Sequence, residues 1–152
     1  MYIIYAFSIL LLIRVIYKAF FTKLETVVDY HQRAFNYVTY FQNRTMAINL
    51  LDQALSMDKF NKVEKASLHL KIGILYFKMK KFEKAKESFE NILSYIKSEN
   101  YSYTKDLSAI VLTYYNLGEK DKARKIYHWL LSKEKYDPDF SHIRYLDTYI
   151  WK

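Results

Sequence analysis

The chain has 152 residues, about the length of one domain, and 51% of them are hydrophobic, which is enough to form a packed core. It contains 2 Gly and 1 Pro, too few for the turns of a β-sandwich or for a glycine-rich phosphate-binding loop. The absence of Cys excludes disulfides, thiolate metal sites and cysteine nucleophiles. The net charge is +8, and the excess is greatest over residues 58–105, so acidic proteins, anionic lipids and nucleic acid are all partners that the charge would suit.

The chain begins with an apolar segment, MYIIYAFSILLLIRVIYKAFF, which predicts a helix over residues 2–21. A cleaved signal peptide is disfavoured because no basic residue precedes the apolar run and no small-residue cleavage site follows it. A core helix is the alternative, although core helices are seldom apolar on every side. We predict a single-pass membrane anchor over residues 1–22. Arg14, Lys18 and Lys23 follow the apolar run, which predicts that the remainder of the chain is cytoplasmic.

Three similar blocks follow at a constant spacing of 38 residues: AINLLDQAL (47–55), AKESFENIL (85–93) and ARKIYHWLL (123–131). Each block starts with Ala and has apolar or small residues four, seven and eight positions later, a spacing that places them on one face of a helix. The small first residue allows a neighbouring helix to approach closely. A second helical pattern precedes each block, so the sequence predicts a repeated pair of helices.

The middle copy, IGILYFKMKKFEKAKESFENIL (72–93), resembles the tetratricopeptide repeat family, whose pattern is L-G-x-x-Y followed by Y-x-x-A-x-x-x-F-x-x-A-L. The third copy matches over residues 114–131, whereas the first, near 28–57, is degenerate because Phe35 replaces the glycine. The resemblance implies an all-α fold, a right-handed solenoid of three helix pairs. The spacing exceeds the family's period of about 34 residues, which predicts slightly longer helices.

The predicted repeat domain covers residues 23–152. Its repeats lie near 24–57, 60–97 and 104–133, with helix pairs at 24–41/44–57, 60–79/82–97 and 104–117/120–133. A capping helix is predicted over 138–150, because Asp137 and Pro138 suit its start and Phe140, Ile143, Leu146 and Ile150 give it an apolar face. Such a helix would cover the last core face of the solenoid.

The resemblance also implies a concave partner-binding groove lined by the first helix of each pair. By register, the candidate residues are Gln32, Arg33, Asn36, Tyr40, Leu70, Lys71, Ile74, Phe77, Lys78, Lys105, Leu112, Tyr115 and Asn116. The middle of this groove is apolar and lies beside Lys71 and Lys78, which suits an amphipathic or acidic helix or peptide. The alternative is that the N-terminal or capping helix fills the groove. Only Asn36 and Lys105 match the five-residue carboxylate clamp of chaperone-binding members, which argues against that ligand.

No catalytic, cofactor or metal site is predicted. His31 and His69 occupy the same repeat position, where packing is a better explanation than metal binding. The sequence therefore predicts a non-catalytic, membrane-anchored scaffold that binds a protein partner. The first alternative is an accessory or assembly subunit of a larger membrane complex. The second is a basic helical-repeat protein that contacts nucleic acid, which is disfavoured because the aromatic residues near the lysines fall at core positions.

Overall fold

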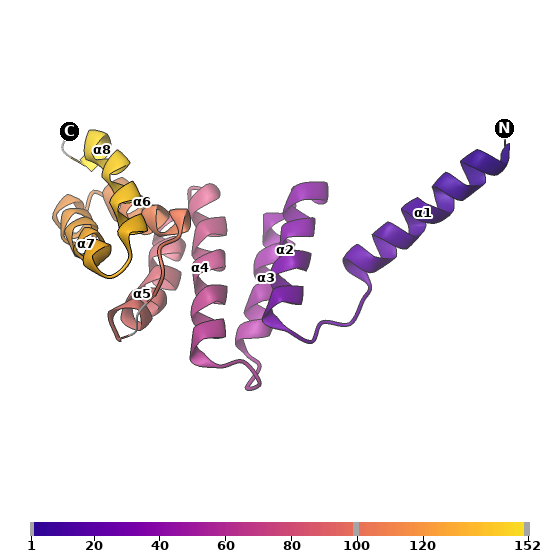
Figure 1. Ribbon diagram of the computed structural model, residues 1–152, viewed down its shortest axis with the longest axis horizontal. Coiled ribbons are helices and arrows are strands. Elements are labelled where there is room, and N and C mark those ends of the chain that lie inside the picture. The colour runs from indigo at the N-terminus through magenta and orange to yellow at the C-terminus, as the bar shows by residue number, and fades with distance from the viewer. Residues whose placement is uncertain (1, 99–100, 151–152) are drawn as a thin grey trace. The chain divides into compact units, whose positions relative to one another are not determined.

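The computed structural model describes residues 2–98 and 101–150, although the side chains of helical residues 2–4, 6, 12, 18 and 98 lie outside this description. Every regular element in the described ranges is helical, as predicted (Figure 1). The chain divides into two compact units, residues 1–57 and residues 58–152. We call these the N-terminal unit and the C-terminal unit.

The N-terminal unit consists of α1 (Tyr2–Phe20), α2 (Val27–Phe41) and α3 (Arg44–Leu55). Thr26 begins α2 through a reciprocal cap: its hydroxyl oxygen accepts from the amide of Asp29 at 3.2 Å, and the Asp29 carboxylate accepts from the amide of Thr26 at 2.8 Å. These hydrogen bonds lower the pKa of Asp29. Gln42, with a φ of 51°, adopts the left-handed conformation that turns the chain from α2 into α3.

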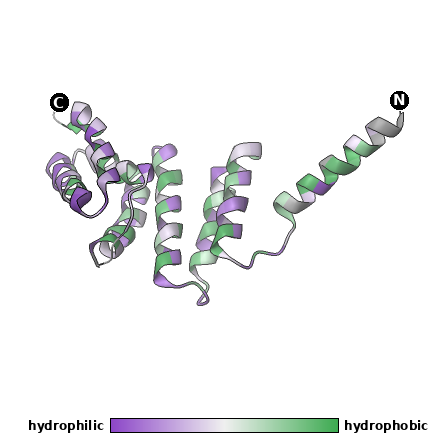
Figure 2. Cartoon of the chain, in the orientation of Figure 1, coloured by the Kyte–Doolittle hydropathy of each residue, from purple (hydrophilic) through white to green (hydrophobic). Residues whose placement is uncertain are grey.

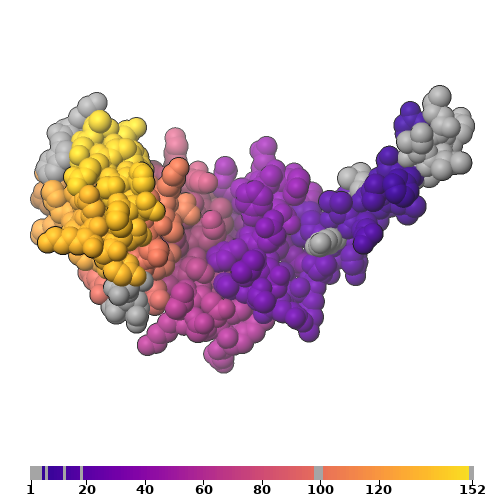
Figure 3. Space-filling view, viewed as in Figure 1, coloured from indigo at the N-terminus to yellow at the C-terminus, as the bar shows by residue number. Residues whose placement is uncertain are grey.

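Most of the described part of α1 is coloured as hydrophobic in Figure 2. Its described atoms, drawn in indigo in Figure 3, lie at the surface, and most of its described side chains are exposed. The described side chains of Phe7, Leu10 and Ile13 are 64%, 65% and 57% exposed. Among the helices and side chains that the structure describes, none combines the length and the apolar character needed to cross a bilayer. A helix therefore forms where the sequence predicted one, but the prediction that it spans a membrane is not confirmed.

The C-terminal unit contains two helix pairs and a terminal segment. Its elements are α4 (Lys62–Lys78), α5 (Phe82–Ser98), η1 (Lys105–Leu107), α6 (Ser108–Asn116), α7 (Lys120–Ser132), η2 (Lys133–Lys135), η3 (Pro138–Leu146) and α8 (Asp147–Ile150). The η elements are 3-10 helices. One hydrophobic core joins α4 through α8 and includes the buried side chains of Phe89, Ile110, Tyr114, Leu130 and Phe140.

The three repeated alanines are buried at equivalent places. Ala47, Ala85 and Ala123 have no exposed surface, and each is the fourth residue of its helix. Gly73 in α4 is equally constrained, because a Cβ atom added there would lie 2.4 Å from the Phe89 ring of α5. These small residues let the paired helices approach closely, which confirms the helical register that the sequence predicted.

The terminal segment differs from the predicted helix over 138–150. The carboxylate of Asp137 caps it as expected, by accepting from the amide of Asp139 at 3.0 Å, but Pro138–Leu146 forms a 3-10 helix and only Asp147–Ile150 is α-helical. Phe140, Ile143 and Leu146 recur every third residue, and a 3-10 helix aligns residues three apart in one row. All three side chains are completely buried in the core of the C-terminal unit.

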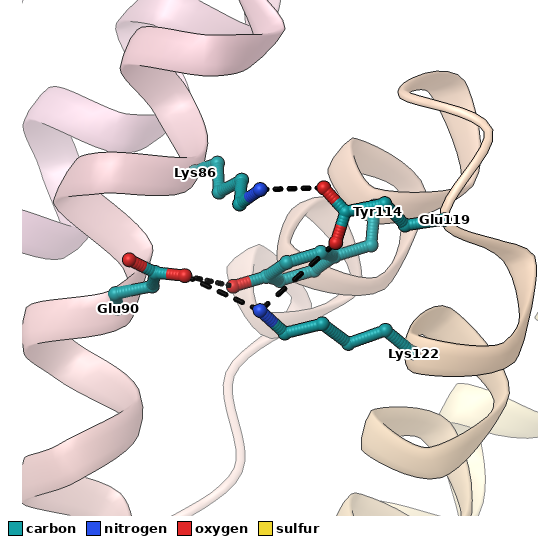
Figure 4. Close-up of polar contacts among 5 residues, drawn as sticks. All are labelled: Lys86, Glu90, Tyr114, Glu119 and Lys122. Atoms are coloured by element: carbon teal, nitrogen blue, oxygen red, sulfur yellow. Dashed lines mark hydrogen bonds and ion pairs between the residues drawn. The ribbon is translucent and has the colours of Figure 1, made fainter.

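A polar cluster fastens α5 to the α6–α7 pair (Figure 4). The Lys86 ammonium pairs with Glu119 at 2.5 Å, and Glu90 accepts from both the Tyr114 hydroxyl and the Lys122 ammonium at 3.3 Å. The hydrogen bond to Glu119 raises the pKa of Lys86. Burial, and then the negative charge of Glu90, raises the pKa of the Tyr114 hydroxyl well above its usual value.

The raised pKa of Tyr114 predicts a loss of stability at alkaline pH. Above about pH 10 the tyrosine ionises in the unfolded chain but stays neutral in the fold, so rising pH favours unfolding by about 1.4 kcal/mol per pH unit. Tyr114→Phe should cost about 1 kcal/mol at pH 7, through loss of one hydrogen bond. At pH 11 we expect this cost to vanish, as measured by urea unfolding at both pH values. An identical cost at both would contradict the raised pKa.

Candidate functional site: the surfaces of the first helices

The candidate residues on α2 contact the end of α1. The Asn36 side chain is buried, and its amide nitrogen donates to the carbonyl oxygen of Ala19 at 3.1 Å. The Gln32 amide nitrogen donates to the Asn36 side-chain oxygen at 3.1 Å, which orients it. The Arg33 guanidinium donates to the carbonyl oxygen of Thr22 and to its hydroxyl oxygen. Polar groups that the sequence assigned to a partner therefore bind the chain itself.

Aromatic packing holds the same contact together. The Phe20 ring lies 5.4 Å from the Tyr37 ring and 5.0 Å from the Phe41 ring, measured between centroids. It also meets Tyr40 edge-on at 6.4 Å, although Tyr40 remains 67% exposed. Such pairs contribute about 0.5–1.5 kcal/mol each beyond the area that they bury. Within the N-terminal unit, α1 therefore covers part of the candidate surface on α2, which is the alternative that the sequence left open.

A cavity of about 370 Å³ remains between α1 and α2. Its lining residues are Val15, Ala19, Thr22, Leu24, Asp29, Gln32, Arg33 and Asn36. Asp29 is engaged in the helix cap, and the Arg33, Gln32 and Asn36 side chains already have the partners described above. Of the polar side chains in this wall, Asn36 bonds α1 and Arg33 bonds the loop after it, while Asp29 and Gln32 bond residues within or beside α2.

The candidate residues on α4, η1 and α6 divide into two groups. Leu70 and Ile74 belong to the core of the C-terminal unit, with 6% and 5% of their surface exposed, so they support this surface from beneath. The others are partly buried or exposed: Lys71, Phe77, Lys78, Lys105, Leu112, Tyr115 and Asn116. We call these seven residues the α4–α6 surface.

Several contacts order the α4–α6 surface. Lys71 on α4 pairs with Asp106 of η1 at 3.6 Å, and the Phe77 ring packs 5.7 Å from the Phe82 ring at the start of α5. The ammonium of Lys120 lies 5.3 Å from the Tyr115 ring centroid. Three lysines and partly buried apolar side chains thus lie on α4, η1 and α6, and the carboxylate of Asp106 compensates part of the positive charge.

A site that the sequence analysis missed lies between the second helices, α5 and α7. It is a cavity of about 380 Å³ lined by Leu93, Lys97, Lys122, Lys125, Ile126 and Trp129. Leu93 and Ile126 are core residues, whereas the lysines surround its opening. The clustering of lysines near the ends of the repeated blocks was the available sequence signal. We call this cavity the α5–α7 slot.

The structure offers no arrangement suited to metal binding within the described residues: no three His, Asp or Glu side chains lie close enough together to hold an ion. Glu83, Glu87 and Glu90 do lie along α5, where they share a shallow cavity with Lys84 and Lys86. Opposite charges at such spacing stabilise a helix.

The comparisons with known proteins agree with the helix-pair geometry. No curated protein and no solved structure matches the chain. Residues 66–99, which cover most of α4 and all of α5, match the tetratricopeptide repeat family. This helix pair, with Gly73 packed on Phe89, is therefore similar to a tetratricopeptide repeat.

Proposed function

We propose that the chain is a non-catalytic scaffold that binds a protein partner on the α4–α6 surface. Tetratricopeptide repeats generally mediate protein–protein interaction, and the repeat match covers most of α4, including all three surface residues that this helix carries. The observation that carries the proposal is the combination of the partly buried Phe77, Leu112 and Tyr115 with three lysines. Lys71 and Lys78 lie on α4, and Lys105 lies in η1, which directly precedes α6. This combination suits an amphipathic segment with acidic residues, because the partner's apolar side chains and carboxylates would both find complementary groups.

We further propose that α1 attaches the scaffold to the cytoplasmic face of a membrane. The support is that α1 is apolar and exposed, and that the basic residues Arg14, within α1, and Lys23, after its end, precede the first acidic residue of the chain, Glu25. A large exposed apolar surface is typical of a site that binds a membrane or another protein. Basic side chains beside it favour contact with anionic lipid headgroups. Attachment would raise the concentration of the scaffold near partners in the same membrane. An accessory subunit, whose α1 packs against other membrane helices, is the alternative.

Photo-crosslinking in cells tests both parts of the proposal. A photoreactive amino acid in place of the exposed Lys78 should give a discrete crosslinked partner, and Lys71→Glu should reduce its yield about fivefold, as expected when a charge at the edge of an interface is reversed. The crosslinked species should sediment with membranes and be released by detergent but not by salt. The same probe at Glu87, on α5, is the control.

Equal crosslinking from Glu87, or a yield that ignores Lys71→Glu, would contradict partner binding on the α4–α6 surface. Release by salt alone would contradict membrane attachment through α1. If the partner stays bound to the chain in both high salt and detergent, the chain is better explained as an accessory subunit than as a transient scaffold.

A further inference from the structure

We propose that the α5–α7 slot is a second docking site, which binds a short acidic peptide segment carrying a large apolar side chain. The slot lies on the second helices of two repeats, whereas the α4–α6 surface lies on the first helices. Its six lining residues take no part in the proposed function above. The proposal rests on the floor of the slot, on the charges around it and on its distribution over two helices.

The floor of the slot is apolar and belongs to the core of the C-terminal unit. Leu93 on α5 and Ile126 on α7 are 7% and 9% exposed and belong to the core of the C-terminal unit. The partly buried Trp129 ring packs against the same core and supplies an aromatic wall. A cavity of about 380 Å³ on such a floor accommodates one or two large side chains, because ligand pockets start near 300 Å³. A Leu or Phe side chain entering the slot would remove apolar surface from water.

The charge around the slot is positive. Lys97 extends from α5, and Lys122 and Lys125 extend from α7, and none of the described residues that line the slot is acidic. Lys122 is held by Glu90 at 3.3 Å and by Glu119 at 4.0 Å. Within the described part of the chain, Lys97 and Lys125 form no ion pair. Carboxylates placed beside the slot would supply the counter-charges that these two lysines lack there.

The arrangement favours a peptide over other anionic ligands. The lysines stand on both sides of the slot, so they match carboxylates spread along a segment better than one compact headgroup. Lys133 lies over the Trp129 ring, 5.3 Å from its centroid, and therefore occupies a position that a stacked nucleic acid base would need. A segment with one apolar side chain between acidic residues meets the floor and both charged edges at once.

A labelled peptide, fluorescein–Asp-Glu-Leu-Phe-Glu-Asp, tests the proposal by fluorescence anisotropy with the full chain. We expect Lys125→Glu to weaken binding at least tenfold and Trp129→Leu to weaken it severalfold. Lys81→Glu, which makes the same charge change on an exposed side chain outside the slot, should have less than a twofold effect. Circular dichroism melting of each variant checks that the fold is intact, and Lys97→Glu provides a second, independent charge reversal from α5.

Four results would overturn the proposal. Lys81→Glu could match Lys125→Glu, which would mean nonspecific charge attraction. A control peptide with Gly-Ser in place of Leu-Phe could bind equally well, which would mean that the apolar floor is unused. Lys71→Glu alone could abolish binding, in which case the peptide occupies the α4–α6 surface and the proposed function survives without the slot. Vesicles of phosphatidylserine could bind through Lys125 while the peptide does not, which would make the ligand a lipid.

Discussion

Gly73→Ala should destabilise the C-terminal unit by about 2 kcal/mol, although alanine normally favours a helix over glycine by about 1 kcal/mol. The new Cβ would lie 2.4 Å from Cε1 and 2.6 Å from Cδ1 of the Phe89 ring, far inside contact distance. Phe89 is fully buried, so its ring cannot turn aside without disturbing the core. Overpacking of this kind costs about 1–3 kcal/mol, and urea unfolding followed by circular dichroism measures it.

Two further variants separate the steric effect from a general effect of losing glycine. Gly118→Ala meets no atom within 4 Å but must adopt a φ of +79°, so it should cost about 1 kcal/mol through backbone strain alone. Phe89→Leu combined with Gly73→Ala should cost at least 1 kcal/mol less than the sum of the single changes, because the smaller side chain makes room. Additive effects would show that Gly73 and Phe89 are not packed as described.

The repeated core could be predicted from sequence because it rests on local periodicity. The Ala-to-Leu blocks at a fixed spacing located α3, α5 and α7, and Ala47, Ala85 and Ala123 are indeed fully buried. Gly73, which matches the glycine of the L-G-x-x-Y pattern, lies where α4 approaches α5 closely. Apolar residues spaced by four, seven and eight specify a helix face without any knowledge of the partner helix.

The covering of α2 could not be predicted in the same way, because it depends on a loop. Whether Phe20 reaches Tyr37 and Phe41 is decided by the path of residues 21–26 between α1 and α2, and no periodicity describes that path. The family register likewise assigned Leu70 and Ile74 to the groove, whereas both belong to the core. The sequence did carry evidence for their burial, because both are large aliphatic residues, and such residues in a helix pair are more often buried than exposed.

The 3-10 segment was predictable in principle. The apolar residues Phe140, Ile143 and Leu146 are each three positions apart, and a spacing of four appears only between Leu146 and Ile150. A constant spacing of three suits the 3.0 residues per turn of a 3-10 helix better than the 3.6 of an α-helix. The capping role depends only on which side chains are buried, so it survives the change of helix type. All three side chains lie in the core that joins the two helix pairs.

Phe140→Ala should therefore destabilise the C-terminal unit by about 3–4 kcal/mol, the range expected when a fully buried phenylalanine is truncated. The loss includes its edge-on contact with the Tyr103 ring, whose centroid lies 5.4 Å away. For a unit of this size, the melting temperature should fall by more than about 12 °C. Thermal unfolding followed by circular dichroism measures the change.

The matched control is Tyr145→Ala, in the same 3-10 helix, whose side chain is 51% exposed and which should cost less than about 0.5 kcal/mol. A large gap between the two variants means that the segment covers the last core face and that its buried row, rather than its helicity, stabilises the repeats. Equal, small effects would mean that residues 138–150 are dispensable, and the core of the C-terminal unit would then need another cover for Ile110 and Leu130.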